Sequence, residues 1–233
     1  MKRLSITMVF LFLFSVSAAP VLAADTFDLV IPLPLTGKPA KFGEIMKKSY
    51  EMAAEEINAA GGIKGSKLAL GFEDSTGKPE TARAIVEKLI EGKQPVIVGE
   101  YTSACAKAVA AVAEERKTPY LIVASADDAI TQQNYQYVFR QNPVNAHYAD
   151  ALVDFLTEVA KPKSMAILYE STAFGTSGAD AMESDAKKHG IQVVAKEKYE
   201  AGARTSSRSF RRSSRLRRTS STWSPTSWTP RSS

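Results

Sequence analysis

The chain has 233 residues, of which 44% are hydrophobic, and it carries 30 Lys and Arg against 25 Asp and Glu, a net charge of +5. This composition can fill one domain core and part of another, and it excludes a disordered or collagen-like chain. The single cysteine, Cys105, excludes an intramolecular disulfide framework, and with only His147 and His189 we expect no metal site and no cofactor.

The excess positive charge lies at one end of the chain. Residues 204–233 hold 8 of the 12 arginines and no Asp or Glu. Residues 1–203 have 22 basic against 25 acidic side chains, a net charge of −3, which becomes −5 without Lys2 and Arg3. The body of the protein is therefore acidic, and its total charge does not indicate nucleic-acid binding.

The N-terminal segment has the pattern of a secretory signal peptide. Lys2 and Arg3 precede an apolar run at residues 8–14, and small residues follow up to Ala23 and Ala24. A retained membrane anchor is the alternative, but the apolar run is far shorter than the roughly 18 residues that span a bilayer. We expect a signal peptide over residues 1–23 and a mature protein in a bacterial periplasm.

Apolar runs alternate with helical periodicity from residue 26 onward. Residues 24–142 are expected to form an N-terminal α/β lobe, with strands at 26–33, 67–73, 95–99 and 120–124 and helices at 43–59, 79–90 and 104–116. In the helix at 43–59, the side chains expected to face the core are Ile45, Tyr50, Met52, Ala53 and Ile57. Repeated β-α units predict a parallel sheet with helices on both faces.

The same alternation resumes after residue 142. A partial second α/β lobe is expected over residues 143–203, with helices at 146–159 and 178–189 and strands at 164–169 and 191–196.

Ligands of such sheets bind beyond the carboxyl ends of the strands, so the loops there are the candidate site. The loop at residues 100–103 (EYTS) brings two hydroxyls and free N–H groups to the start of a helix, which favours a carboxylate. The loop at residues 124–126 (ASA) follows the next strand, and its backbone carbonyls are expected to accept from an ammonium. The two loops together suit a free amino acid.

Each of these residues also has a structural interpretation. Thr102 and Ser103 are good helix N-caps, and Phe42 and Tyr101 are equally ordinary core or lid aromatics. Cys105 is expected to be a small packing residue rather than a nucleophile. No nucleophile–base–acid set and no GxSxG, HExxH or phosphate-loop motif is present, so we expect no enzyme.

Five segments resemble one protein family. They are residues 31–43 (IPLPLTGKPAKFG), 53–68 (AAEEINAAGGIKGSKL), 96–103 (VIVGEYTS), 119–131 (PYLIVASADDAIT) and 166–175 (AILYESTAFG). They are similar to the periplasmic ligand-binding proteins of branched-chain amino-acid ABC transporters, the leucine/isoleucine/valine-binding type. The resemblance implies the type I periplasmic-binding-protein fold, in which two α/β lobes clamp a ligand and deliver it to a permease and ATPase complex in the inner membrane.

The resemblance also implies roles for eight residues. Ser103, with the backbone beside it at Thr102, would hold the ligand carboxylate, and Ser125 and Ala126 lie in the loop that receives the ammonium. The side chains that border the ligand would be Phe42, Tyr101 and, from the second lobe, Phe174. Asp127 either helps to bind the ammonium or caps the short helix that follows it. This loop is shorter and more acidic than in a typical leucine binder, which leaves the ligand open.

The chain departs from the family after residue 203. Where the family continues with an amphipathic helix and an apolar strand, residues 204–233 are rich in Arg, Ser and Thr. We interpret this tail as a shifted reading frame that encodes a disordered segment; the alternative is a genuine tail for RNA or anionic surfaces. Sequencing the gene across codons 200–233 decides between them, since an intact frame in independent reads would contradict the shift.

A shifted frame would leave the second lobe incomplete. We then expect a bare sheet edge, a tendency to aggregate, and weak or no binding of amino acid.

A ligand-sensing domain for a signalling partner is the alternative function on the same fold. A neighbouring permease gene would favour the transport function, and a neighbouring kinase gene would favour the sensing function.

Overall fold

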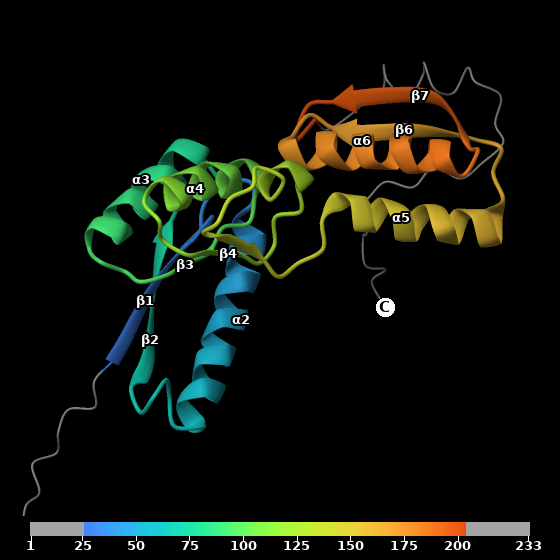
Figure 1. Cartoon of the computed structure of the whole chain (residues 1–233). Coiled ribbons are helices and arrows are strands. Elements are labelled where there is room, and N and C mark those ends of the chain that lie inside the picture. The colour runs from blue at the N-terminus through green and yellow to red at the C-terminus, as the bar shows by residue number, and fades with distance from the viewer. Residues whose placement is uncertain (1–25, 204–233) are drawn as a thin grey trace, which may run out of the picture.

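The computed structural model describes residues 26–203 (Figure 1). The predicted signal peptide and the Arg/Ser-rich tail lie outside the described residues. Strands and helices alternate through the first half in the order β1 Thr26–Leu33, α2 Ala40–Ala59, β2 Lys67–Asp74, α3 Pro79–Glu91, β3 Ile97–Gly99, α4 Ser103–Glu115, β4 Tyr120–Ile122, the 3-10 turn η1 Asp128–Ile130 and β5 Val138–Arg140. This is the predicted β-α alternation, with one short strand that was not predicted, β5; the short helix expected after Asp127 is η1.

All the strand pairs of this first half are parallel. β1 pairs with β2 along its whole length, from Thr26 opposite Lys67 to Leu33 opposite Asp74. β3, β4 and β5 form a second ladder, and the N–H of Glu100 at the end of β3 donates to the carbonyl of Pro32 in β1 at 3.0 Å. The carboxyl ends of β1 and β3 are therefore held side by side.

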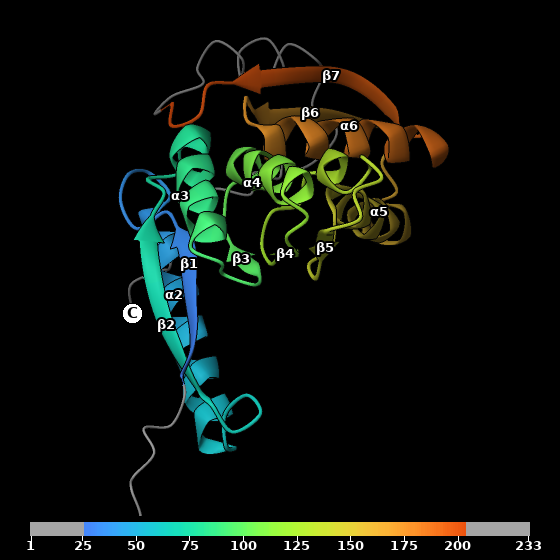
Figure 2. The same cartoon turned by 60° about the vertical axis from the view of Figure 1, so that its left-hand side comes forward.

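The core of the first half lies between this sheet and the helices α3 and α4. Figure 2 shows α3 and α4 next to each other above β3, β4 and β5, with α2 running beside β1 and β2. The buried side chains include Val86 of α3, Val109 of α4, and Ile97, Tyr120 and Ile122 of the strands. Burial of these apolar side chains stabilises the sheet and the loops at its carboxyl end, because removing apolar surface from water contributes about 25 cal/mol for each Å².

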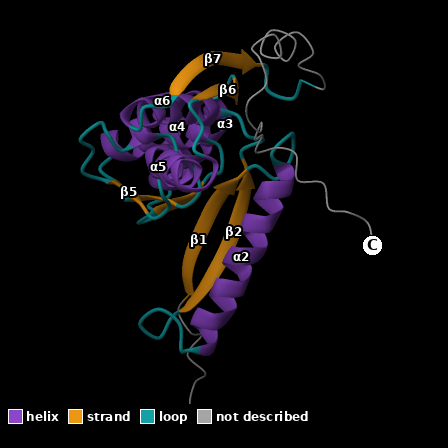
Figure 3. Cartoon of the chain, turned by 90° about the vertical axis from the view of Figure 1, so that its right-hand side faces the viewer, coloured by secondary structure: helices purple, strands orange, loops and turns teal. Residues whose placement is uncertain are grey.

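The predicted inward face of α2 is wrong for four of its five residues. Ile45, Met52 and Ile57 are 53%, 60% and 37% exposed, whereas the residues buried in α2 are Gly43 and Ala54. Of the five predicted residues, only Tyr50 is partly buried, with its hydroxyl inside. Small residues let the helix backbone approach the sheet closely, so the contact line follows them rather than the large apolar side chains. Figure 3 shows α2 along the β1–β2 pair.

The second half repeats the alternation with α5 Asn145–Phe155, the π-helical turn η2 Leu156–Ala160, β6 Ser164–Glu170, α6 Ala173–Lys188 and β7 Gln192–Tyr199. β6 and β7 pair in parallel, with one irregularity in register between Met165 and Ala166. α6 lies between α5 and this strand pair (Figure 1), around a small core that contains Val153, Ala186 and Ile191. The predicted division into lobes at residues 142 and 143 stays a prediction.

The start of α6 differs from the prediction. The helix begins at Ala173 rather than at Gly178, because the Thr172 side chain caps it by accepting from the N–H of Gly175 at 3.0 Å. Phe174 therefore lies in the first turn of a helix and not in a loop.

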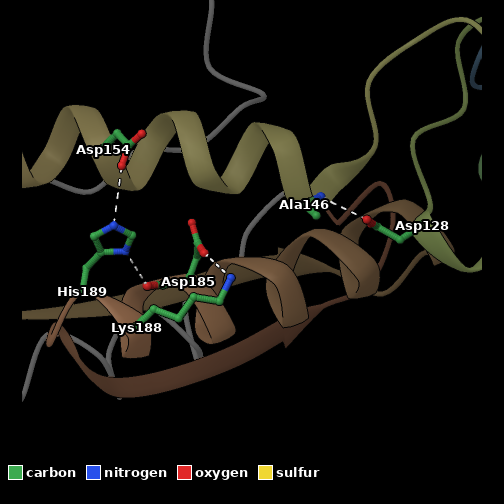
Figure 4. A network of polar contacts seen from close by, with 6 residues as sticks. All are labelled: Asp128, Ala146, Asp154, Asp185, Lys188 and His189. Atoms are coloured by element: carbon green, nitrogen blue, oxygen red, sulfur yellow. Dashed lines mark hydrogen bonds and ion pairs between the residues drawn. The ribbon is translucent and has the colours of Figure 1, made fainter.

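Figure 4 shows one polar contact between α5 and His189, the residue after α6, and another within α6. His189 Nε2 lies 3.5 Å from Asp154 Oδ1, and Lys188 Nζ lies 2.7 Å from the buried Asp185.

Among residues 26–203, no helix is long and apolar enough to cross a membrane.

Candidate functional site

At the start of α4, Thr102 and Ser103 differ in whether their hydroxyls cap the helix. Thr102 is the N-cap, since its side chain accepts from the N–H of Cys105 at 3.2 Å. Ser103 is 3% exposed, and its Oγ has no hydrogen-bond partner among the described residues. A buried hydroxyl without a partner is costly, so the Oγ of Ser103 has an unused capacity to bind a ligand at this helix start.

An aromatic pair stands beside this helix start. The rings of Phe42 and Tyr101 stack with centroids 4.6 Å apart and planes 8° from parallel. Phe42 remains 47% exposed, so one face of the pair is open to a ligand. Burial raises the pKa of Tyr101, and the carboxylate of Glu170, at the end of β6, raises it further. The negative charge of Glu170, in the second half of the chain, therefore acts on the Tyr101 hydroxyl.

The loop after β4 corrects the prediction of free carbonyls. The Ser125 carbonyl accepts from Arg140 Nη1 and, at 2.9 Å, from Asn142 Nδ2, while the Ala126 carbonyl accepts from the N–H of Asn145 at 2.8 Å. The cause is β5, the unpredicted strand that brings Arg140 to this loop. The Ser125 hydroxyl donates to the Tyr101 carbonyl at 3.1 Å, so Ser125 still belongs to the group around the start of α4.

Asp127 acts as a cap in this structure. Its Oδ1 accepts from the N–H of Ala129 at 3.0 Å, at the start of η1. The neighbouring Asp128 links the two halves, since its side chain accepts from the N–H of Ala146 at 3.2 Å (Figure 4) and from the Ser177 hydroxyl at 2.9 Å.

Phe174 lies on the second half of the chain. It is 47% exposed, and its carbonyl accepts from Asn145 Nδ2 at 3.0 Å. Its ring stacks on no other aromatic ring in the described part of the chain. Tyr101 thus contacts Phe42 and Ser125 directly, and Thr102 and Ser103 follow it in the chain. Asn145 connects Ala126 to Phe174, and Asp127 follows Ala126.

A cleft of about 710 Å³ lies to one side of this group. It is lined by Lys107 of α4, by Asp127 and Asp128, and by Ser177 and Asp180 of α6. Of the eight predicted site residues, only Asp127 lines it. Ser103, whose hydroxyl has no partner, does not line this cleft.

The cysteine near this helix start has the features of a packing residue. Cys105 is fully buried, and burial raises the pKa of its thiol to about 12, as expected of a packing residue. Within residues 26–203, no three His, Cys, Asp or Glu side chains are grouped to hold a metal ion.

Replacing Arg140 with methionine is expected to lower the free energy of unfolding by about 1–2 kcal/mol, because the carbonyls of Ser125 and Asp127 each lose a charged donor. Urea unfolding measures the change. Arg83→Met is the matched control, since Arg83 pairs only with Glu87 on the surface of α3 and should cost no more than about 0.5 kcal/mol. Equal losses in the two variants would contradict the buried role of Arg140.

Comparison with known proteins places the chain among solute-binding proteins. A family model described as periplasmic binding protein matches residues 29–212. The Leu/Ile/Val-binding protein homolog 8 of Brucella abortus is 34% identical over 177 residues, which cover 71% of this chain and 43% of the homologue. The chain therefore spans less than half the length of this relative.

Solved structures share the fold. The branched-chain amino acid transporter substrate binding protein LivJ from Streptococcus pneumoniae, in complex with isoleucine, superposes with a TM-score of 0.71 at 22% identity, covering 81% of this chain and 53% of that one. An ABC transporter solute binding protein from R. palustris, in complex with benzoate, gives a TM-score of 0.73 at 21% identity, covering 82% and 53%.

Proposed function

This chain belongs to the periplasmic binding protein family, and from that premise we propose that the protein captures a free branched-chain or related amino acid in the periplasm and delivers it to an ABC permease and ATPase complex. The matched relatives are solute-binding proteins rather than enzymes, and the fold is the type I periplasmic binding fold, of which the chain spans part.

The observation that supports this proposal is the unpartnered Oγ of Ser103 at the start of α4. A carboxylate at this position would accept from the Ser103 hydroxyl and from the free N–H groups of the first turn, and the helix dipole favours a negative charge there. The Phe42–Tyr101 pair supplies an apolar wall beside it. This arrangement fits a ligand with a carboxylate and an apolar body.

For the ammonium group we propose a partner other than the Ser125 carbonyl. Because protein donors already occupy that carbonyl, we assign the ammonium to the side of the site toward Glu170, whose charge acts on Tyr101. Isoleucine and benzoate, the ligands of the two structural neighbours, share a carboxylate and an apolar body, and only isoleucine has an ammonium. The negative charge of Glu170 would attract the ammonium of an amino acid, and an aromatic acid such as benzoate has no such group.

The affinity of this chain by itself is expected to be low. It spans 43% of the length of the Brucella homologue, and it supplies the carboxylate position and one aromatic wall. We therefore expect a dissociation constant for leucine in the millimolar range. Calorimetry that gave a micromolar constant would contradict this expectation.

Ser103→Ala tests the proposed site. Loss of a hydrogen bond to a charged group should weaken leucine binding about tenfold or more, measured by titrating leucine into the ¹⁵N-labelled chain and following amide shifts. Ser184→Ala is the control, because Ser184 is exposed on α6 and should bind leucine like the unaltered chain. Equal binding by the Ser103 variant would refute the assignment.

A further inference from the structure

Glu100 is a buried carboxyl group directly before the candidate site. It is 0% exposed and follows the last residue of β3, in the left-handed backbone region with φ of 58°. Its Oε2 accepts a long hydrogen bond of 3.4 Å from the N–H of Tyr101, and its Oε1 makes no hydrogen bond of ordinary geometry. None of the ion pairs among residues 26–203 includes Glu100.

The groups around Glu100 do not neutralise its charge. The Ser75 hydroxyl and the Cys105 thiol lie beside the carboxyl, Tyr120 of β4 is buried nearby, and Asp74 at the end of β2 adds a like charge. Asp74 stays ionised because, against the effect of burial, hydrogen bonds from Thr36 and from neighbouring N–H groups lower its pKa. Burial raises the pKa of Glu100 to about 7.

Glu100 and the proposed ligand carboxylate share one helix start. Glu100 precedes the N-cap Thr102 by two residues, and Ser103 follows that cap. The partial positive charge of a helix N-terminus is confined to its first turn, so two anions held there compete for it and repel each other. A proton on Glu100 removes both effects.

Resting on the proposed function, we propose that Glu100 is a positioning residue for the ligand carboxylate: in its neutral form it leaves the start of α4 to the ligand, and in its ionised form it opposes binding. Ligand binding then raises the proton affinity of Glu100, and protonation raises the affinity for the ligand by the same factor. The site therefore takes up carboxylate ligands in mildly acidic medium and releases them as the medium becomes alkaline.

Leucine titration of the ¹⁵N-labelled full chain at about pH 6 and about pH 8 tests this inference. A coupling of one pKa unit corresponds to a tenfold change over the whole titration of Glu100, so the dissociation constant of the unaltered chain should rise about fivefold between pH 6 and pH 8. Glu100→Gln, which mimics the neutral carboxyl, should bind with a constant that changes less than about twofold. The control Glu91→Gln, at an exposed position on α3, should keep the full dependence.

Each outcome is decisive. A pH dependence that persists in Glu100→Gln, or that is missing from the unaltered chain, would overturn the role of Glu100 while leaving the proposed function intact. Absence of leucine binding at both pH values in both proteins would contradict the proposed function, and with it this inference.

Discussion

Replacing Glu100 with glutamine is expected to raise the free energy of unfolding by about 3 kcal/mol at pH 8 and to leave it nearly unchanged below pH 4.5. Burial raises the pKa of Glu100 from 4.5 to about 7, so the folded state holds this proton more tightly than the unfolded state does. The stability of the unaltered protein therefore falls as the pH rises from about 4.5 to about 7, and it stays reduced above that range. Glutamine, which has no charge to bury, avoids the loss.

Urea unfolding followed by far-UV circular dichroism at both pH values measures this effect. Glu91→Gln is the matched control, since the exposed Glu91 carries no such burial cost and the substitution should change stability by less than about 0.5 kcal/mol. A glutamine variant that is less stable than the unaltered chain at pH 8 would show that the Glu100 carboxylate has a stabilising partner.

Gly43→Ala is expected to lower the free energy of unfolding by about 2–4 kcal/mol. A methyl group at Gly43 would lie 2.1 Å from the carbonyl oxygen of Pro34 and 2.7 Å from its carbon. Both are backbone atoms that cannot move aside without shifting the loop before α2, so the helix start and the adjacent Phe42 must be displaced. Stacking of Phe42 on Tyr101 should weaken with it.

Gly178→Ala is the matched control for this effect. A methyl group at Gly178 of α6 would meet only the Asn145 side chain at 3.7 Å or more, an ordinary contact. Because alanine is favoured over glycine within helices, this variant should gain about 0.5–1 kcal/mol. Urea unfolding compares the two, and a Gly43 variant as stable as the unaltered chain would refute the close approach of α2 to Pro34.

The sequence predicted the elements whose signal is local. β1 coincides with its predicted range at residues 26–33, and α3 with Pro79 at its start differs by one residue at its end. Short apolar runs and helical periodicity depend on neighbours within one element, so they are readable along the chain. β3 and β4 have only three residues each but lie in longer apolar runs, whereas the three residues of β5 end in a charged side chain and show no such run.

The arrangement of the site depends on contacts between distant residues, and it was predicted only in part. Thr102 and Ser103 were equal candidates for the cap, and only the hydrogen bond from Cys105 identifies Thr102. Arg140 reaches Ser125 from 15 positions away, through a strand that the pattern did not show. The sequence places Glu100 in the binding loop, but nothing in its neighbours indicates that its side chain turns inward.

Mapping leucine binding on the ¹⁵N-labelled chain tests the proposed ligand site at the start of α4. Our assignment predicts that the largest amide shifts occur at residues 101–105, that they saturate, and that Ser103→Ala abolishes most of them. Shifts confined to the neighbouring cleft, at Lys107, Ser177 and Asp180, or no saturable shifts at all, would contradict the site at the start of α4.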